Sequence, residues 1–168
     1  GKEASGCFTT IGCCGGCPLR TLQEATEAES RFSMLEIIRE FALEQLRTGG
    51  ELATMQRRHA EYFAAWAQQA EAQLEGPDQA AWLARLEQEA DNLRAALATL
   101  LAGGPLATAA SMACALGAFW QRQGHYSEGR RWLEQVLAQS DQAPEAAPAT
   151  LRARVLQTAA SLAYRRGD

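Results

Sequence analysis

The chain has 168 residues, of which 47% are hydrophobic and only 7% aromatic, and its formal net charge is −4. Alanine supplies much of the apolar content and favours close-packed helices, so the composition predicts an all-α protein. The acidic balance argues against nonspecific binding of nucleic acid by the chain as a whole, because phosphate backbones attract basic surfaces.

Residues 1–30 form a poorly specified segment, in which a cluster rich in Cys and Gly precedes the acidic stretch TLQEATEAES. The N-terminal residues show no secretory signal, because they lack a basic segment followed by an apolar run. The spacing of Cys14 and Cys17 suits a zinc ligand pair, with Cys7 and Cys13 as the other candidate ligands. Adjacent Cys13 and Cys14 do not easily point at one ion, so an incidental Cys-rich tail is the competing interpretation.

The helical period begins after RFSM, which favours a short strand, and continues to Leu46. Ser33 and Glu36 match a capping box, which predicts that this helix begins at Ser33 and ends at residues 48–50. Periodic stripes then predict a helix from about 51 to 74 and, after a break at Gly76-Pro77-Asp78, another helix that continues to Leu101.

The C-terminal half predicts further antiparallel helices with short connections. These helices cover about 106–123, 126–140 and 150–166, with a linker at 141–149. Residues 95–121 carry no charge, yet Gly103-Gly104-Pro105 interrupts them, which favours two buried helices over a membrane span. A soluble, cytoplasmic protein without a membrane partner is therefore expected.

The stretch LGAFWQRQGHYSEGRRWLEQVL, residues 116–137, has the spacing of a tetratricopeptide-type helical hairpin. Gly117 and Gly129 occupy positions where two helices cross closely, and His125 is expected to cap the turn. Residues that pack this repeat are predicted to be Leu116, Gly117, Trp120, Gly124, Tyr126, Gly129, Leu133 and Leu137.

A weak internal repeat relates FWQRQG to AYRRGD, and places Gly124 and Gly167 43 residues apart. The linker at 141–149 accounts for the excess over the usual period of 34 residues. This pattern predicts that a further helix would cover Val155, Leu156, Ala159 and Leu162, or that a second copy of the chain would do so.

Four phrases in this order, RFSMLEIIREFALEQL, RRHAEYFAAWAQQAE, GPDQAAWLARLEQEADNLRAAL and GHYSEGRRWLEQVL, resemble the middle of bacterial STAND-type regulators of the LuxR-like or antibiotic-regulatory kind. The resemblance implies the end of a winged-helix-like region at 31–47, a helical connector at 48–104, and incomplete tetratricopeptide-like repeats at 105–168. It also implies an upstream nucleotide-binding domain in the same polypeptide.

In that family a Met-His-Asp triplet helps to hold ADP, and the matching residues here are Met34, Leu35 and Glu36. Leu35 cannot donate to a phosphate, so this contact is not expected. No phosphate loop GxxxxGK[ST] is present, and the two histidines, His59 and His125, form no triad motif. The chain is therefore expected to bind no cofactor and to catalyse no reaction, and Cys114 is expected to be a small core residue.

Basic residues gather in the C-terminal third and could present a positive face to an acidic peptide or to nucleic acid, with solvated helix surface as the favoured alternative. They are Arg122, Arg130, Arg131, Arg152, Arg154, Arg165 and Arg166. The sequence thus predicts a non-catalytic sensor module that binds a protein or small-molecule effector. Two alternatives stay open: a zinc- or redox-active protein centred on residues 7–17, and a plain oligomerisation scaffold.

Overall fold

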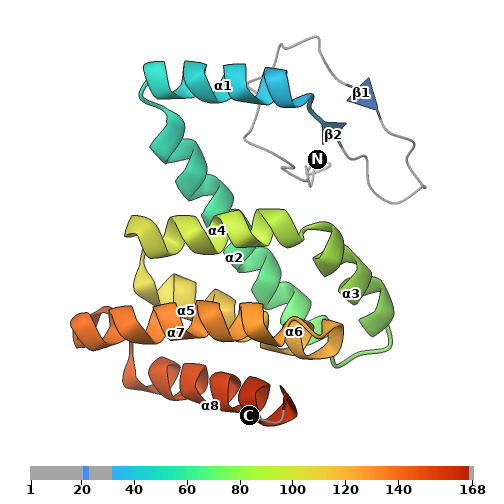
Figure 1. Cartoon of the computed structure of the whole chain (residues 1–168), viewed down its shortest axis with the longest axis vertical. Coiled ribbons are helices and arrows are strands. Elements are labelled where there is room, and N and C mark those ends of the chain that lie inside the picture. The colour runs from blue at the N-terminus through green and yellow to red at the C-terminus, as the bar shows by residue number, and fades with distance from the viewer. Residues whose placement is uncertain (1–20, 23–31, 167–168) are drawn as a thin grey trace, which may run out of the picture. The chain divides into compact units, whose positions relative to one another are not determined.

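The computed structural model describes residues 21–22 and 32–166, and its contacts divide the chain into two compact units, residues 1–59 and 60–168 (Figure 1). The predicted all-α fold of antiparallel helical pairs is confirmed. The elements in chain order are β1 (Thr21–Leu22), β2 (Phe32–Ser33), α1 (Glu36–Thr48), α2 (Leu52–Gln73), α3 (Gln79–Gln88), α4 (Ala90–Gly103), α5 (Leu106–Ala115), α6 (Gly117–Gln123), α7 (Tyr126–Gln142), the 3-10 turn η1 (Pro144–Ala146) and α8 (Ala149–Arg166).

In the first unit, β1 and β2 pair antiparallel, with Leu22 opposite Phe32, and α1 follows directly. The predicted capping box is wrong, because Ser33 lies in β2 and the N-cap of α1 is Leu35, which makes no side-chain cap. Gly50 ends the turn after α1 with a φ of 72°, a left-handed conformation that glycine adopts without strain.

The single helix predicted between the break at 76–78 and Leu101 is wrong, since α3 and α4 meet at Glu89 and the chain changes direction there (Figure 1). Backbone hydrogen bonding continues across this corner, from Glu89 N–H to the Arg85 carbonyl and from Leu93 N–H to the Glu89 carbonyl. The change of direction allows both Leu86 and Leu93 to be buried in the core. Burial of these side chains therefore favours the bend, although no Gly or Pro lies at Glu89 to indicate it in the sequence.

The helix predicted over 106–123 is likewise two helices, α5 and α6, which meet at Leu116. Hydrogen bonds from Leu116 N–H to the Met112 carbonyl and from Trp120 N–H to the Leu116 carbonyl keep the two nearly continuous. Helices α7 and α8 then pack against this pair and against each other. Among the described residues, none of the helices is both long and apolar enough to cross a bilayer.

The core of the second unit is built largely from alanine and leucine, which allow the helices to approach closely. Val155 and Leu162 are fully buried in this core, and Ala159 is partly buried against it. The expectation that these residues need another cover is therefore wrong, because α5, α6 and α7 already cover that face of α8. Of the four residues in question, only Leu156 stays exposed.

Candidate interaction surface

The centre of the helical hairpin is a close crossing of three helices at Gly129 of α7. A Cβ atom built on Gly129 would lie 2.6 Å from Cε3 of Trp120 in α6 and 2.9 Å from Cδ1 of Leu162 in α8. These distances are too short for two carbon atoms that are not bonded to each other. A glycine is therefore required at position 129 for the indole to lie against the backbone of α7.

Gly117 makes a second close crossing, between α6 and α8. A Cβ atom there would lie 2.5 Å from Cγ2 of Thr158. Cys114, one turn earlier, is buried near the same threonine, and this burial raises the pKa of its thiol. A buried, protonated thiol is unreactive, so Cys114 acts as a small core side chain.

The structure places the predicted repeat-packing residues around these two crossings. Leu116, Gly117, Trp120, Gly129 and Leu133 are buried. Gly124 caps α6 in the left-handed region, with a φ of 78°. Tyr126 and Leu137 are partly buried against the core.

His125 precedes α7 at the N-cap position, but its side chain makes no cap hydrogen bond, contrary to prediction. Its Nε2 atom instead lies 3.1 Å from Oε2 of Glu87 in α3, and its ring lies beside Phe119 with the centroids 5.7 Å apart. The ring therefore joins the turn between α6 and α7 to α3 and α6.

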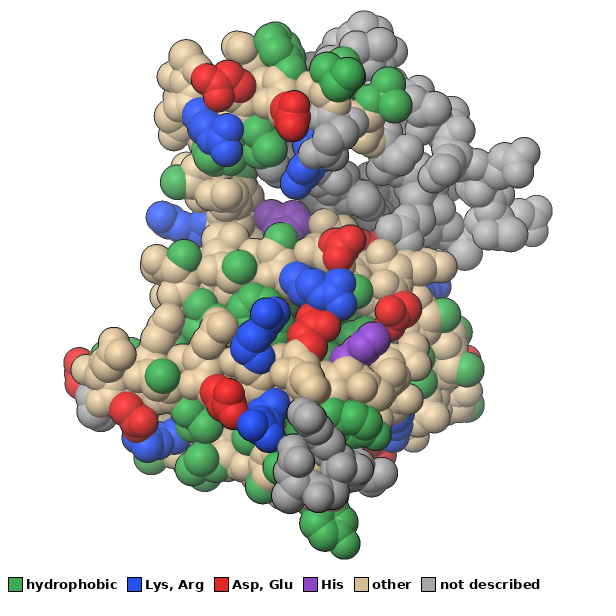
Figure 2. Space-filling model, in the orientation of Figure 1, with side chains coloured by type: hydrophobic (Ala, Val, Ile, Leu, Met, Phe, Trp, Pro, Cys, Tyr) green, Lys and Arg blue, Asp and Glu red, His purple; other side chains and the backbone are tan. Residues whose placement is uncertain are grey.

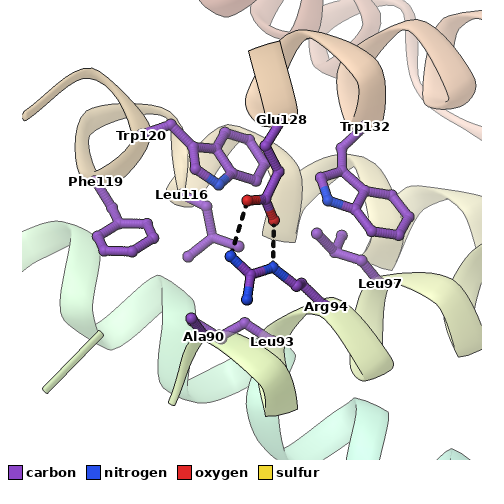
Figure 3. A pocket seen from close by; sticks show the side chains of 9 residues that line it. All are labelled: Ala90, Leu93, Arg94, Leu97, Leu116, Phe119, Trp120, Glu128 and Trp132. Carbon is purple, nitrogen blue, oxygen red and sulfur yellow. Dashed lines mark hydrogen bonds and ion pairs between the residues drawn. The ribbon is translucent and has the colours of Figure 1, made fainter. Parts of the chain in front are cut away.

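A bidentate ion pair joins α4 to α7, as Figure 3 shows. Arg94 donates from Nε to Oε1 of Glu128 at 2.7 Å and from Nη2 to Oε2 at 2.9 Å, and donates from Nη1 to Asp91 at 2.8 Å. These hydrogen bonds hold the pKa of Glu128 below its usual range. The sequence pattern did not indicate this pair, because Arg94 and Glu128 lie 34 residues apart in different helices.

The pocket around this ion pair is small. Its volume is about 10 Å³, and its walls are the side chains drawn in Figure 3. A cavity of this size admits about one water molecule, far below the several hundred Å³ that small-molecule ligands occupy. The Nε1 atom of Trp132, whose residue is only 8% exposed, faces this pocket without a hydrogen bond of regular geometry, and its N–H helps Arg94 to lower the pKa of Glu128.

Two side chains cap helix ends from neighbouring helices. Nη1 of Arg122 in α6 donates to the Leu74 carbonyl at the end of α2, at 2.9 Å. Nε2 of Gln139 in α7 donates to the Leu101 carbonyl near the end of α4, at 3.0 Å. Because the last carbonyls of a helix lack partners within it, these bonds satisfy them and fix the helices against one another.

Four of the five basic residues predicted to bind a partner form ion pairs within the chain, and the fifth, Arg131, lies over an aromatic ring. Arg122 lies 3.5 Å from Glu75, Arg130 pairs with Glu134 at 3.0 Å and Arg152 with Asp141 at 2.6 Å. Arg154 donates to both oxygens of Glu71, and the guanidinium of Arg131 lies over the Trp132 ring. Figure 2 shows basic and acidic side chains interspersed on the visible face. An acidic partner that binds these arginines would therefore have to displace the Asp and Glu side chains with which they already pair.

Several predicted residues lie outside the described part of the chain. Cys7, Cys13, Cys14 and Cys17 are all among them, so the zinc alternative stays a prediction. Arg165 and Arg166 belong to α8, but their side chains are outside the description. Among the residues that the structure does describe, no three His, Cys, Asp or Glu side chains gather as a metal site.

The fold is thus that of an all-α protein, in which antiparallel helical pairs are joined by short connections and pack closely at Gly117 and Gly129. Over 139 residues, 81% of its length, the chain is 34% identical to proteins named "Putative HTH-type transcriptional regulator" from Mycobacterium bovis and from two strains of Mycobacterium tuberculosis. It spans about 15% of the length of these curated relatives. No protein-family model matches the chain, and no solved structure matches it significantly.

Proposed function

We propose that the chain is a non-catalytic, tetratricopeptide-like interaction module of a bacterial transcriptional regulator that works in the cytoplasm. The observation that carries this proposal is the close packing of α6, α7 and α8 at Gly117 and Gly129, in the hairpin whose sequence has tetratricopeptide-type spacing. Stacked helical pairs are typical of repeat arrays, which bind partners on a surface shared by several hairpins. The likeness to regulators supplies the biological context.

A protein or peptide is the effector that fits this geometry best. The pocket at Glu128 is too small for a metabolite, whereas the outer faces of the helices are broad and lined with weak, exposed ion pairs. Surface ion pairs contribute about 0–1 kcal/mol each, so an acidic peptide can replace Glu134 beside Arg130 at little cost. Arg131, which is exposed on α7, would extend the same basic contact.

The signal would travel by a shift in population. An effector that binds one arrangement of the helical pairs more tightly favours that arrangement. The hydrogen bonds from Arg122 to the Leu74 carbonyl and from Gln139 to the Leu101 carbonyl support this proposal, since they join helices of the second unit through which a change could pass. A nucleotide-binding domain elsewhere in the same polypeptide would then receive the change.

A segment exchange tests this function. In the Mycobacterium tuberculosis relative, the matching 139-residue stretch is deleted or replaced by the corresponding stretch of this chain, and transcript profiles are measured. The deletion should alter the profile and the exchange should restore it. A Gly129→Leu version of the exchange, which overpacks the crossing, should behave like the deletion. An unchanged profile after deletion would contradict the regulatory role.

A further inference from the structure

Three groups that attract a carboxylate lie in or beside the pocket in Figure 3. The guanidinium of Arg94, whose side chain is 40% exposed, binds both oxygens of Glu128, whose side chain is 21% exposed. Nε1 of Trp132 faces the same pocket, and the guanidinium of Arg131 lies 5.2 Å from the centre of a Trp132 ring. The carboxylate of Glu128 therefore occupies an anion site that is partly open to solvent.

Helical spacing brings these groups to one side of α7. Arg131 and Trp132 follow Glu128 by three and four residues, a spacing that places side chains on the same helix face. The N–H of Trp132 interacts with Glu128 only weakly and makes no hydrogen bond of regular geometry. Arg131 is exposed and forms no ion pair with a residue that the structure describes. Glu128 thus leaves part of the site free for a further acidic group.

We propose that an acidic partner peptide places one of its carboxylate side chains on Arg94 in place of Glu128, and that this exchange breaks the link between α4 and α7. The inference rests on the proposed function and deepens it, since it says where the acidic effector binds and which contact between helices it changes. Glu128 is then an internal competitor that fills the site when no partner is bound. The partner binds only the arrangement in which Arg94 is free, so its binding shifts the population toward that arrangement.

The geometry of the site fits a carboxylate better than a phosphate. Arg94 already holds the two oxygens of one planar group, the pairing for which a guanidinium is suited. A phosphate brings further oxygens, whereas Leu93, Leu97 and Phe119 in the pocket walls offer no side-chain donor. The pocket of about 10 Å³ leaves no room for a group much larger than the one displaced. The ligand group is therefore an Asp or Glu side chain.

The exchange needs a second contact beside Arg94. Glu128 belongs to the chain and so competes at a high effective concentration, which a single free carboxylate does not match. A peptide with several acidic residues reaches Arg94 and Arg131 at once, and the second contact offsets this advantage of Glu128. The site should therefore prefer peptides that carry more than one acidic side chain.

Calorimetric titration with a blocked peptide of glutamate residues tests the exchange, and a glutamine peptide of the same length is the neutral probe. Glu128→Gln keeps the size of the side chain and removes the competing charge. It should bind the glutamate peptide about tenfold more tightly than the wild type does. Adding Arg94→Gln to Glu128→Gln should remove this gain, and Arg131→Gln alone should weaken binding severalfold.

Glu71→Gln is the matched control. Glu71 of α2 accepts through both of its oxygens from Arg154 of α8, so this variant also releases an arginine from a two-oxygen pair. It changes the charge of the chain by the same amount as Glu128→Gln. Its affinity for the glutamate peptide should stay near that of the wild type.

Acetate gives a second measurement, because Glu128→Ala removes a group of about the size of acetate. Acetate should raise the unfolding midpoint of Glu128→Ala above its value in an equal concentration of chloride, since a ligand of the folded state stabilises it. The midpoint of Glu71→Ala should be the same in both salts.

Three results would overturn the proposal. They are equal or undetectable binding of the glutamate peptide by wild type and Glu128→Gln, a gain that survives Arg94→Gln, and a greater stabilisation of Glu128→Ala by phosphate than by acetate. The last result would assign the site to a phosphate-bearing partner instead. The segment exchange in the regulator is independent of all three, so failure here and failure of the proposed function are distinguishable.

Discussion

Trp120 of α6 lies so close to Gly129 of α7 that a Cβ atom on Gly129 would stand 2.6 Å from Cε3 and 2.7 Å from Cδ2 of the indole ring. The contact joins the two helices of the hairpin at its centre, and Leu162 of α8 completes it at 2.9 Å. The absence of a side chain on Gly129 thus sets the spacing of α6, α7 and α8. The atoms of Trp120 at this contact belong to a rigid ring.

Gly129→Ala should destabilise the protein by about 1–3 kcal/mol, because the ring of Trp120 cannot move aside. This loss exceeds the gain of about 1 kcal/mol that alanine brings to a helix interior. Denaturant unfolding measures the change. Gly103→Ala is the control, since nothing lies within 4 Å of its Cβ position, and it should be neutral or slightly stabilising.

Gly117→Ala should cost about 1–3 kcal/mol through the contact with Cγ2 of Thr158. Thr158→Ser removes that methyl group and keeps the hydroxyl that donates to the Arg154 carbonyl. The double variant should therefore recover most of the loss in a thermodynamic cycle. Additive effects of the two substitutions would show that the helices do not cross here.

Glu128→Gln should reduce the free energy of unfolding at neutral pH by about 1–3 kcal/mol, since it removes a charge-assisted pair with Arg94. The pKa of Glu128 is lowered in the folded protein, so its contribution is fully present above the unfolded value of about 4.3. The contribution disappears as the pH falls through the folded pKa, below that value.

The stability difference between wild type and Glu128→Gln should therefore shrink in acid, and urea titrations from pH 7 to pH 3 can follow it. Asp91→Asn is the control, because Asp91 is almost fully exposed although it also pairs with Arg94. Its effect should stay near zero. A difference between wild type and Glu128→Gln that grows in acid would contradict the pairing.

Trp132→Phe should change the stability by less than about 1 kcal/mol, because the buried N–H that it removes makes no hydrogen bond of regular geometry and interacts only weakly with Glu128. Trp132→Ala should cost about 3–5 kcal/mol through the cavity that it leaves. Thermal melts of the two variants separate these outcomes. A large loss for Trp132→Phe would mean that the indole N–H is firmly hydrogen-bonded, either to Glu128 or to a bound water.

Much of this fold could be predicted from local pattern. The stripe of Leu86, Leu93, Leu97 and Leu100 is buried as its helical spacing indicates, and Gly117 and Gly129 are found at close crossings. Both signals are local, since periodicity and the absence of a Cβ atom act within one or two turns.

The remaining features depend on distant parts of the chain. The bend at Glu89 follows from packing, because no Gly or Pro marks it, whereas the bend at Leu116 lies directly before Gly117. The burial of Val155 depends on helices that precede it by tens of residues. The cap of Leu74 by Arg122 joins residues 48 apart, and charge alone could not distinguish this role from a partner-binding one.

Hydrogen exchange across α4–α8 is the most direct test of the account, because signal transmission requires stacked helices that respond as one body. We expect the slowest amides of α4, α5 and α7 to exchange only through global unfolding. Gly129→Ala should lower their protection by the same free energy in all three helices. Loss of protection in α7 and α8 alone, with α4 and α5 unchanged, would contradict a coupled array.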